Sequence, residues 1–191
     1  DDAGRPAYGY QGNWRDIFQN WEALGLSFPD YLSQFVAVFL NASTADGYNP
    51  YRITRAGIDW EVEDPRDPWS HIGYWGDHQV VYLLRLLEAL ERHEPGGLAA
   101  RLDDRTYAYA HVPYRISQLD ELLRNPRSTI EFDRALHERL TSDSRSLGAD
   151  GKLARDADGR VVLVTLLEKL LVPLLVKLTN FVPGGGIWLN T

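Results

Sequence analysis

Three long apolar segments with helical spacing constrain this chain most. One follows Pro29 and runs to about Ala42, a second covers Val80–Leu90, and the third is Val161–Val182. Their apolar residues spread over a wider face than a helix of a small two-layer bundle buries. The segments therefore favour a mainly helical fold, in which inner helices are covered by outer ones.

The third segment, Val161–Val182, is about as long as a bilayer span. It contains a proline near its middle and three charged residues, Glu168, Lys169 and Lys177. Each charge at the centre of a membrane span costs about 2.5–3.5 kcal/mol. We therefore predict a buried helix that ends near Asn180, and no membrane partner.

Caps and apolar spacing predict the remaining helices. Asn13 is a suitable N-cap for a helix over Trp14–Leu24, and Gly25 is expected to end it. Ser128 and Glu131 form a capping-box pattern that predicts a helix to about Ser142. We also expect a helix from Gly76 or Asp77 to His93, a helical turn at Leu98–Leu102 and a short helix at Ser117–Arg124.

Short alternating runs predict β-structure in the connections. We expect a hairpin around Arg55-Ala56-Gly57, with strands at Tyr51–Thr54 and Ile58–Val62. A further strand is predicted at Arg105–Val112. Lys152–Arg155 and Arg160–Val164 would form a second hairpin around a turn at residues 156–159.

Composition excludes several classes of function. The 191 residues fit one domain or part of one, and a formal charge of −7 without a basic run argues against a nucleic-acid partner. The absence of Cys excludes disulfides, thiolate metal sites and a Cys nucleophile. No phosphate-binding loop or dinucleotide fingerprint occurs, and His71, Asp77 and His78 match no standard metal spacing. We expect no cofactor, no metal and a cytoplasmic location.

The segment Asp46–Gln79 carries most of the functional signal. It holds three of the six Trp, three Tyr, seven Asp or Glu and two of the five His. Most of it is too rich in Pro and Gly for one regular element. Sugars present C–H faces to aromatic rings and hydroxyl groups to carboxylates, so this composition is typical of a sugar-binding cleft.

Two interpretations apply to Asp77, which precedes an apolar helix. An acidic residue in a first helical turn stabilises the helix by about 0.3–1 kcal/mol, so Asp77 could be a cap alone. Alternatively, Asp77 lies at the floor of a cleft with Trp75 or Trp69 as a stacking face. Tyr74 and His78 are further candidate binding residues beside it.

Two other groups could contribute to the same cleft. Trp14, Arg15 and Asp16 open the first predicted helix, where they are either a surface ion pair or polar groups that face a pocket. Asp59-Trp60-Glu61 and Glu63-Asp64 could supply two carboxylates for acid–base chemistry, although acidic loop residues are commonly just solvated.

The order of three motifs resembles a known superfamily. Residues 12–19, GNWRDIFQ, the loop Asp46–Gln79, and residues 181–188, FVPGGGIW, together resemble the six-hairpin, (α/α)6-toroid glycosidases and phosphorylases. The closest group is a set of large bacterial proteins related to cellobiose phosphorylases and glucoamylases. The resemblance covers most of the chain and implies that residues 1–191 are a segment of a larger (α/α)6 catalytic domain, with short β-hairpins in its long loops.

The resemblance also implies roles for particular residues. Arg15-Asp16 match an Arg-Asp pair that lines the sugar subsite, and Asp77 matches an acidic residue that reaches the sugar. The family's general acid usually lies in a Trp-Asn-Asp-like motif after a Gly-rich segment. Gly184–Gly186 provides the Gly-rich segment, but no such motif occurs before Thr191. The acid is therefore expected outside these residues, or it is absent.

These observations lead to two functional hypotheses. The first is glycosidic-bond cleavage, by hydrolysis or phosphorolysis, of an oligosaccharide or glycoside in a cleft lined by Trp and Asp. The remainder of the toroid would be its structural partner. The second is a non-catalytic helical domain that binds a glycan or a protein.

Overall fold

The computed structural model describes residues 11–45, 47, 52–54, 57–60, 62, 64, 66, 80–125 and 130–179. This part is mainly helical, with short antiparallel strand pairs, as predicted. Its α-helices are α1 (Trp14–Ser27), α2 (Leu32–Asn41), α3 (Val80–His93), α4 (Gly97–Arg101), α5 (Leu119–Arg124), α6 (Arg134–Leu147) and α7 (Leu166–Thr179). Two 3₁₀ helices are η1 (Pro29–Tyr31) and η3 (Gly148–Lys152).

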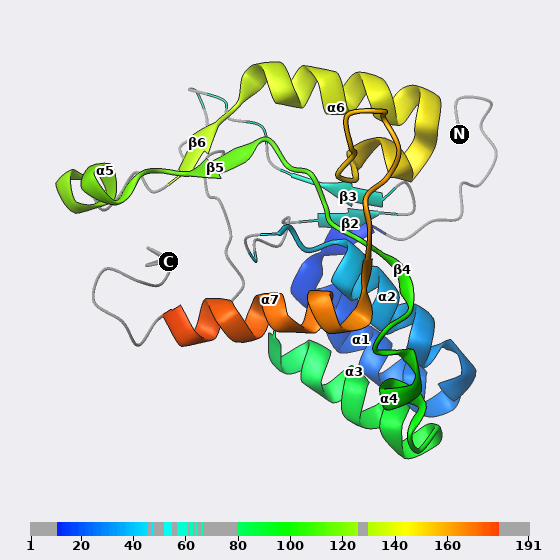
Figure 1. Ribbon diagram of the computed structural model, residues 1–191. Coiled ribbons are helices and arrows are strands. Elements are labelled where there is room, and N and C mark those ends of the chain that lie inside the picture. The colour runs from blue at the N-terminus through cyan, green and yellow to red at the C-terminus, as the bar shows by residue number, and fades with distance from the viewer. Residues whose placement is uncertain are drawn as a thin grey trace.

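The strands form three small antiparallel sheets. One has the order β1 (Gln11–Asn13), β2 (Arg52–Thr54) and β3 (Gly57–Asp59). The second pairs β4 (Arg105–Ala108) with β7 (Leu163–Thr165), and the third pairs β5 (Tyr114–Ile116) with β6 (Ile130–Phe132). Figure 1 shows α1, α2, α3 and α4 gathered at one end and α6 at the other, with β2 and β3 between them.

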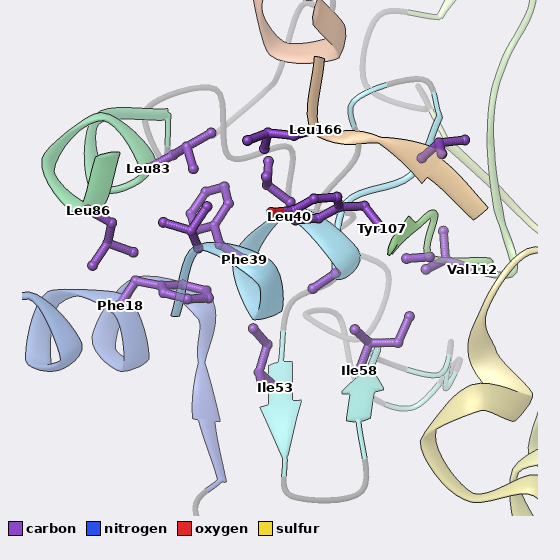
Figure 2. Packing of buried hydrophobic residues seen from close by; sticks show 14 of the residues in the cluster. Phe18, Phe39, Leu40, Ile53, Ile58, Leu83, Leu86, Tyr107, Val112 and Leu166 are labelled. Carbon is purple, nitrogen blue, oxygen red and sulfur yellow. The ribbon is translucent and has the colours of Figure 1, made fainter. Parts of the chain in front are cut away.

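The core forms where helices α1, α2 and α3 meet the first sheet. The rings of Phe18 and Phe39 are 4.6 Å apart at their centroids, and Phe18 is fully buried. Leu86 of α3 and Leu166 of α7 are buried in the same cluster. Figure 2 shows Ile53 and Ile58, from β2 and β3, pointing toward these helices. Hydrophobic burial thus fixes the sheet against the helices.

The first helix extends further than predicted. Gly25 does not end α1, which continues to Ser27. A Cβ at Gly25 would lie 2.5 Å from the Leu32 side chain, so this glycine permits close packing of α1 against α2. Leu24, where the predicted helix ends, is 44% exposed. Pro29 begins η1, and the regular α-helix α2 starts only at Leu32.

The predicted helix from Ser128 to Ser142 is wrong at its start. Glu131 lies in β6, opposite Arg115 of β5, where strand pairing satisfies its backbone. Helix α6 begins after Asp133, whose Oδ1 accepts a hydrogen bond of 2.9 Å from the Leu136 N–H. Asp133 is therefore the cap, and Ser128 lies outside the described residues.

The predicted hairpins are confirmed with shorter strands. In the first hairpin, Gly57 has a φ of 103° and pairs with Thr54, and Ile58 pairs with Ile53. At the second hairpin, an isolated bridge joins Arg155 to Val161, and β7 then pairs with β4. The predicted strand over Arg105–Val112 is regular only as far as Ala108.

The third apolar segment forms strand β7 and then helix α7, which starts at Leu166. No helix within the described ranges is long and apolar enough to cross a membrane. Helix α3 is described from Val80, so the predicted helix start at Gly76 or Asp77 lies outside the described residues.

Candidate functional site

The first sheet brings together two segments that are distant in the sequence. Asn13 of β1 lies opposite Arg52 of β2, and Arg52 lies opposite Asp59 of β3. Neighbouring strands are about 4.8 Å apart, so the backbones of Asn13 and Asp59 are separated by about 10 Å. Helix α1 starts directly after Asn13. The two predicted binding segments, residues 14–16 and 59–60, therefore flank one row of the sheet.

Asp59 occupies one end of this row between two cations. Its Oδ1 is 3.2 Å from Lys152 Nζ, and its Oδ2 is 3.4 Å from Arg52 Nη2. The Asp59 side chain is 36% exposed, whereas that of Lys152 is only 15% exposed. Lys152 also donates to the Ile58 carbonyl at 2.9 Å. Asp59 is thus held in place while part of its carboxylate remains accessible as an acceptor for hydroxyl groups.

Trp60 does not offer an open stacking face. It is 2% exposed, and its indole N–H donates to Nδ1 of His137 at 3.0 Å. The ammonium group of Lys152 lies 4.7 Å from the centroid of the Trp60 ring. Because the indole N–H can only donate, His137 Nδ1 must act as the acceptor. This candidate cleft residue instead joins the end of β3 to α6.

Trp14, Arg15 and Asp16 form the first turn of α1. For Trp14 and Arg15 the structure describes the backbone alone, while the Asp16 side chain is exposed. The helix N-terminus carries partial positive charge, so an acidic residue in this turn is favourable. Both interpretations of Asp16, a surface ion pair and a polar group that faces a pocket, are compatible with this exposed position.

The other predicted binding residues, Trp69, Tyr74, Trp75, Asp77 and His78, lie outside the described residues. The acidic pair after Trp60 is described only at Asp64. It forms a hydrogen-bonded ion pair with Arg66, in which both carboxylate oxygens accept from the guanidinium at 3.0–3.1 Å. This pairing lowers the pKa of the Asp64 carboxyl. In the described part of the chain, no group of three or more His, Asp or Glu residues could hold a metal ion.

The sequence did not indicate the polar contacts of Lys152 with His111 and Trp60. His111 donates its backbone N–H to the Lys152 carbonyl at 2.9 Å. Burial, together with the nearby Arg139 and Arg115, lowers the pKa of its imidazole. His137 and Lys152 each stand alone in the sequence, so no spacing pattern could have indicated that both contact Trp60.

A second buried polar group lies in the core. Lys169 of α7 is fully buried, and its Nζ donates to the Ser43 carbonyl at 3.0 Å and lies 4.0 Å from the Tyr109 ring centroid. Burial lowers the pKa of Lys169 to about 7. Ser43 follows the C-terminus of α2, where the partial negative charge of the helix favours a cation. Lys169 therefore joins α7 to α2.

A comparison of the chain with protein-family models finds no match. A comparison with curated proteins also finds no match.

Proposed function

We propose that this chain forms one wall of a carbohydrate-binding cleft in an (α/α)6-toroid enzyme that cleaves glycosidic bonds. The observation that carries the proposal is the row Asn13–Arg52–Asp59. It brings an accessible, firmly held carboxylate to the start of helix α1, where the Arg-Asp pair of the resemblance lies. In this proposal the protein is cytoplasmic, needs no cofactor, and binds an oligosaccharide or glycoside.

In this cleft, Asp59 and Asp16 would accept hydrogen bonds from sugar hydroxyl groups. The proposal also includes Asp77 as a further hydrogen-bonding acid and Trp69 and Trp75 as stacking faces. Trp60 would act by position alone, because its bond to His137 holds the backbone next to Asp59. Cleavage would pass through an oxocarbenium-like transition state and would require a general acid.

Hydrolysis and phosphorolysis differ in what attacks the sugar. An inverting hydrolase uses a second carboxylate to activate water, whereas a phosphorylase uses phosphate held by basic residues. Arg52 and Arg66 are possible phosphate contacts, yet each already pairs with an acid, Arg52 with Asp59 and Arg66 with Asp64. Because both arginines are already paired, neither identifies a phosphate site. The proposal therefore includes both hydrolysis and phosphorolysis.

The main test measures sugar binding and turnover by the protein that contains this chain. Oligosaccharides would be supplied with and without inorganic phosphate, and binding would be followed by calorimetry. Asp59→Asn removes the charge that faces the cleft and should weaken sugar binding by about tenfold, since hydrogen bonds to charged groups contribute about 1.5–3 kcal/mol. Asp158→Asn is the matched control, because Asp158 also pairs with an arginine, Arg160, but belongs to an exposed pair outside the proposed cleft.

Asp77→Asn separates the two interpretations of Asp77. A fall in sugar affinity with an unchanged melting temperature would support the subsite role. A lower melting temperature with unchanged affinity would mean that Asp77 is a cap only. Equal sugar binding by the wild type and by both the Asp59 and Asp77 variants would overturn the proposed cleft.

The second candidate is a non-catalytic helical domain that binds a glycan or a protein. The exposed leucines of α7 favour protein binding, because large apolar side chains are concentrated on one helix. Glycan binding without turnover, in the presence and absence of phosphate, would favour this candidate over the enzyme.

A further inference from the structure

A network from three elements surrounds the end of β3, where the proposed sugar-binding acid lies. Trp60 follows β3 directly, and its indole N–H donates to Nδ1 of His137 on α6 at 3.0 Å. The Lys152 ammonium group of η3 lies over the Trp60 ring, 4.7 Å from its centroid. The same ammonium group is 3.2 Å from Asp59 Oδ1. Asp59 is therefore connected to His137 through Lys152 and Trp60.

Arg52 provides a second connection between Asp59 and Trp60. Its Nη2 lies 3.4 Å from Asp59 Oδ2 and also donates to the Trp60 carbonyl at 3.4 Å. Asp59 and Trp60 thus share two cationic neighbours, Arg52 and Lys152. A displacement of Trp60 would move both the carbonyl that Arg52 contacts and the ring that Lys152 contacts. The Asp59 carboxylate would then lose its present orientation.

The position of Trp60 depends on His137 as an acceptor. Trp60 is 2% exposed, so an indole N–H that lost the imidazole would have little access to water. A buried donor without a partner is costly, whereas a satisfied donor fixes its side chain. The Trp60 ring is held at 78° to the imidazole plane, which directs the N–H at Nδ1. His137 therefore determines whether Trp60 keeps its place.

The other described charged groups around the imidazole offer no replacement acceptor. Lys152, over the Trp60 ring, and Arg134, over an aromatic ring beside the imidazole, can only donate. Asp133, one turn before His137, uses its carboxylate to cap α6 and to pair with an arginine. Asp59 already lies between two cations.

We propose that His137 is a positioning residue, which holds Asp59 in its sugar-binding orientation through Trp60 only while the imidazole is neutral. This inference rests on the proposed function, because it assigns Asp59 to the sugar cleft. A neutral imidazole accepts at Nδ1 and carries its proton on Nε2, whereas an imidazolium donates from both nitrogens and cannot accept. His137 is partly exposed, so it exchanges protons with solvent. Protonation breaks the bond to Trp60, and sugar binding weakens as the pH falls.

The test compares two substitutions of His137, one with and one without an acceptor. His137→Asn places an amide oxygen close to the position of Nδ1 and does not titrate, whereas His137→Leu has no acceptor. We expect the wild-type affinity for an oligosaccharide to fall about tenfold between pH 8 and pH 5, the range in which histidines titrate. The His137→Asn variant should keep the wild-type affinity at both pH values. The His137→Leu variant should bind weakly at both.

A spectroscopic readout tests the bond without sugar. The protein would be labelled with fluorotryptophan, and the fluorine NMR signal of Trp60 would be the one that Trp60→Phe removes. This signal should shift between pH 8 and pH 5 in the wild type but not in His137→Asn. His93→Asn is the matched control, since His93 pairs with Asp30 on other elements, and it should keep the wild-type pH response.

The inference is overturned if the Trp60 signal or the sugar affinity responds to pH equally in the wild type and in His137→Asn. Wild-type affinity in a folded His137→Leu variant would overturn it as well. If that variant does not fold, the wild type and His137→Asn still decide the outcome. If the wild type binds no sugar at either pH, the proposed cleft fails and the role of Asp59 with it. The Trp60 signal then decides separately whether His137 holds the indole.

Discussion

Lys169 illustrates how one side chain can make stability depend on pH. Its ammonium group is buried against the Ser43 carbonyl and the Tyr109 ring, and no carboxylate among the described residues forms an ion pair with it. Burial lowers its pKa from 10.5 to about 7. The unfolded chain therefore binds more protons than the folded chain between these two values. Stability must rise with pH across this window.

We predict that unfolding free energy increases by about 1–2 kcal/mol between pH 7 and pH 9. Urea denaturation at several pH values would measure this increase. The window ends at pH 9 because burial raises the pKa values of Tyr107 and Tyr109, whose opposite effect begins near pH 10. Lys169→Met should abolish the increase, whereas Lys152→Met, at a lysine paired with Asp59, should retain it. A wild-type stability that is flat or falls over this range would contradict the prediction.

At the level of single residues, the sequence indicates which functional groups a segment carries better than it indicates whether those groups are exposed or buried. Asp59 was singled out for its carboxylate, and the structure gives it a partly exposed position. Trp60, a candidate cleft residue, lies in the core with its N–H bonded to His137. Its partner is 77 residues away in the sequence, and local composition contains no information about such a contact.

Helix α6 provides a test at the level of elements, because a single side chain caps it. Asp133→Ala removes the acceptor for the Leu136 N–H and should lower the unfolding free energy by about 1 kcal/mol. Asp133→Asn keeps a capping oxygen and removes only the exposed ion pair with Arg115, so it should cost less than about 0.5 kcal/mol. Thermal or urea denaturation would distinguish the two. Equal losses would mean that the ion pair, and not the cap, stabilises α6.

The junction of α6 with η3 depends on a close backbone approach. A Cβ at Gly151 would lie 2.5 Å from the Ser144 backbone nitrogen, a distance that the helix backbone cannot accommodate without moving. Gly151→Ala should therefore destabilise the protein by about 1–3 kcal/mol. Ser146→Ala, at an exposed site on the same helix, is the control and should be nearly neutral. Unchanged urea denaturation of the Gly151 variant would contradict this packing.

Element types were predictable from periodicity, and element boundaries were not. The apolar spacing predicts α1, α2, α3 and α7 as helices, and the structure confirms them. Each of these helices buries one face in the shared core. The start of α6 was misplaced because two local rules competed for the same residues. Ser128 and Glu131 matched a capping box, but Glu131 pairs with Arg115 in a strand, and this pairing depends on a segment that the local pattern does not include.

For the molecule as a whole, the clearest feature is an apolar surface on α7. Five leucines at helical spacing are 40–55% exposed: Leu167, Leu171, Leu174, Leu175 and Leu178. Exposed apolar patches of this kind lead to association when nothing covers them. The predicted toroid would cover them with neighbouring helices, although a toroid could be inferred only from the resemblance.

We predict that the 191-residue chain on its own self-associates at micromolar concentrations. Sedimentation velocity should show species larger than 21.7 kDa, and a dye that binds apolar surface should give a strong signal. Leu174→Lys together with Leu178→Glu should shift the chain toward the monomer, because both side chains are about half exposed and their replacement costs little in the core. A cooperative melt of a monomer by the unmodified chain would contradict this prediction.

The Ser43 carbonyl has a consequence for the order in which the protein acquires its structure during synthesis. This oxygen accepts from the Ala110 N–H and from Lys169 Nζ, which is 126 residues further along the chain. At about 5–20 residues per second, Lys169 is synthesised roughly 6–25 seconds after Ser43. During that interval the nascent chain must keep the core site for Leu166 and Lys169 unfilled. Chaperone binding to ribosome-bound chains should therefore persist until α7 has emerged.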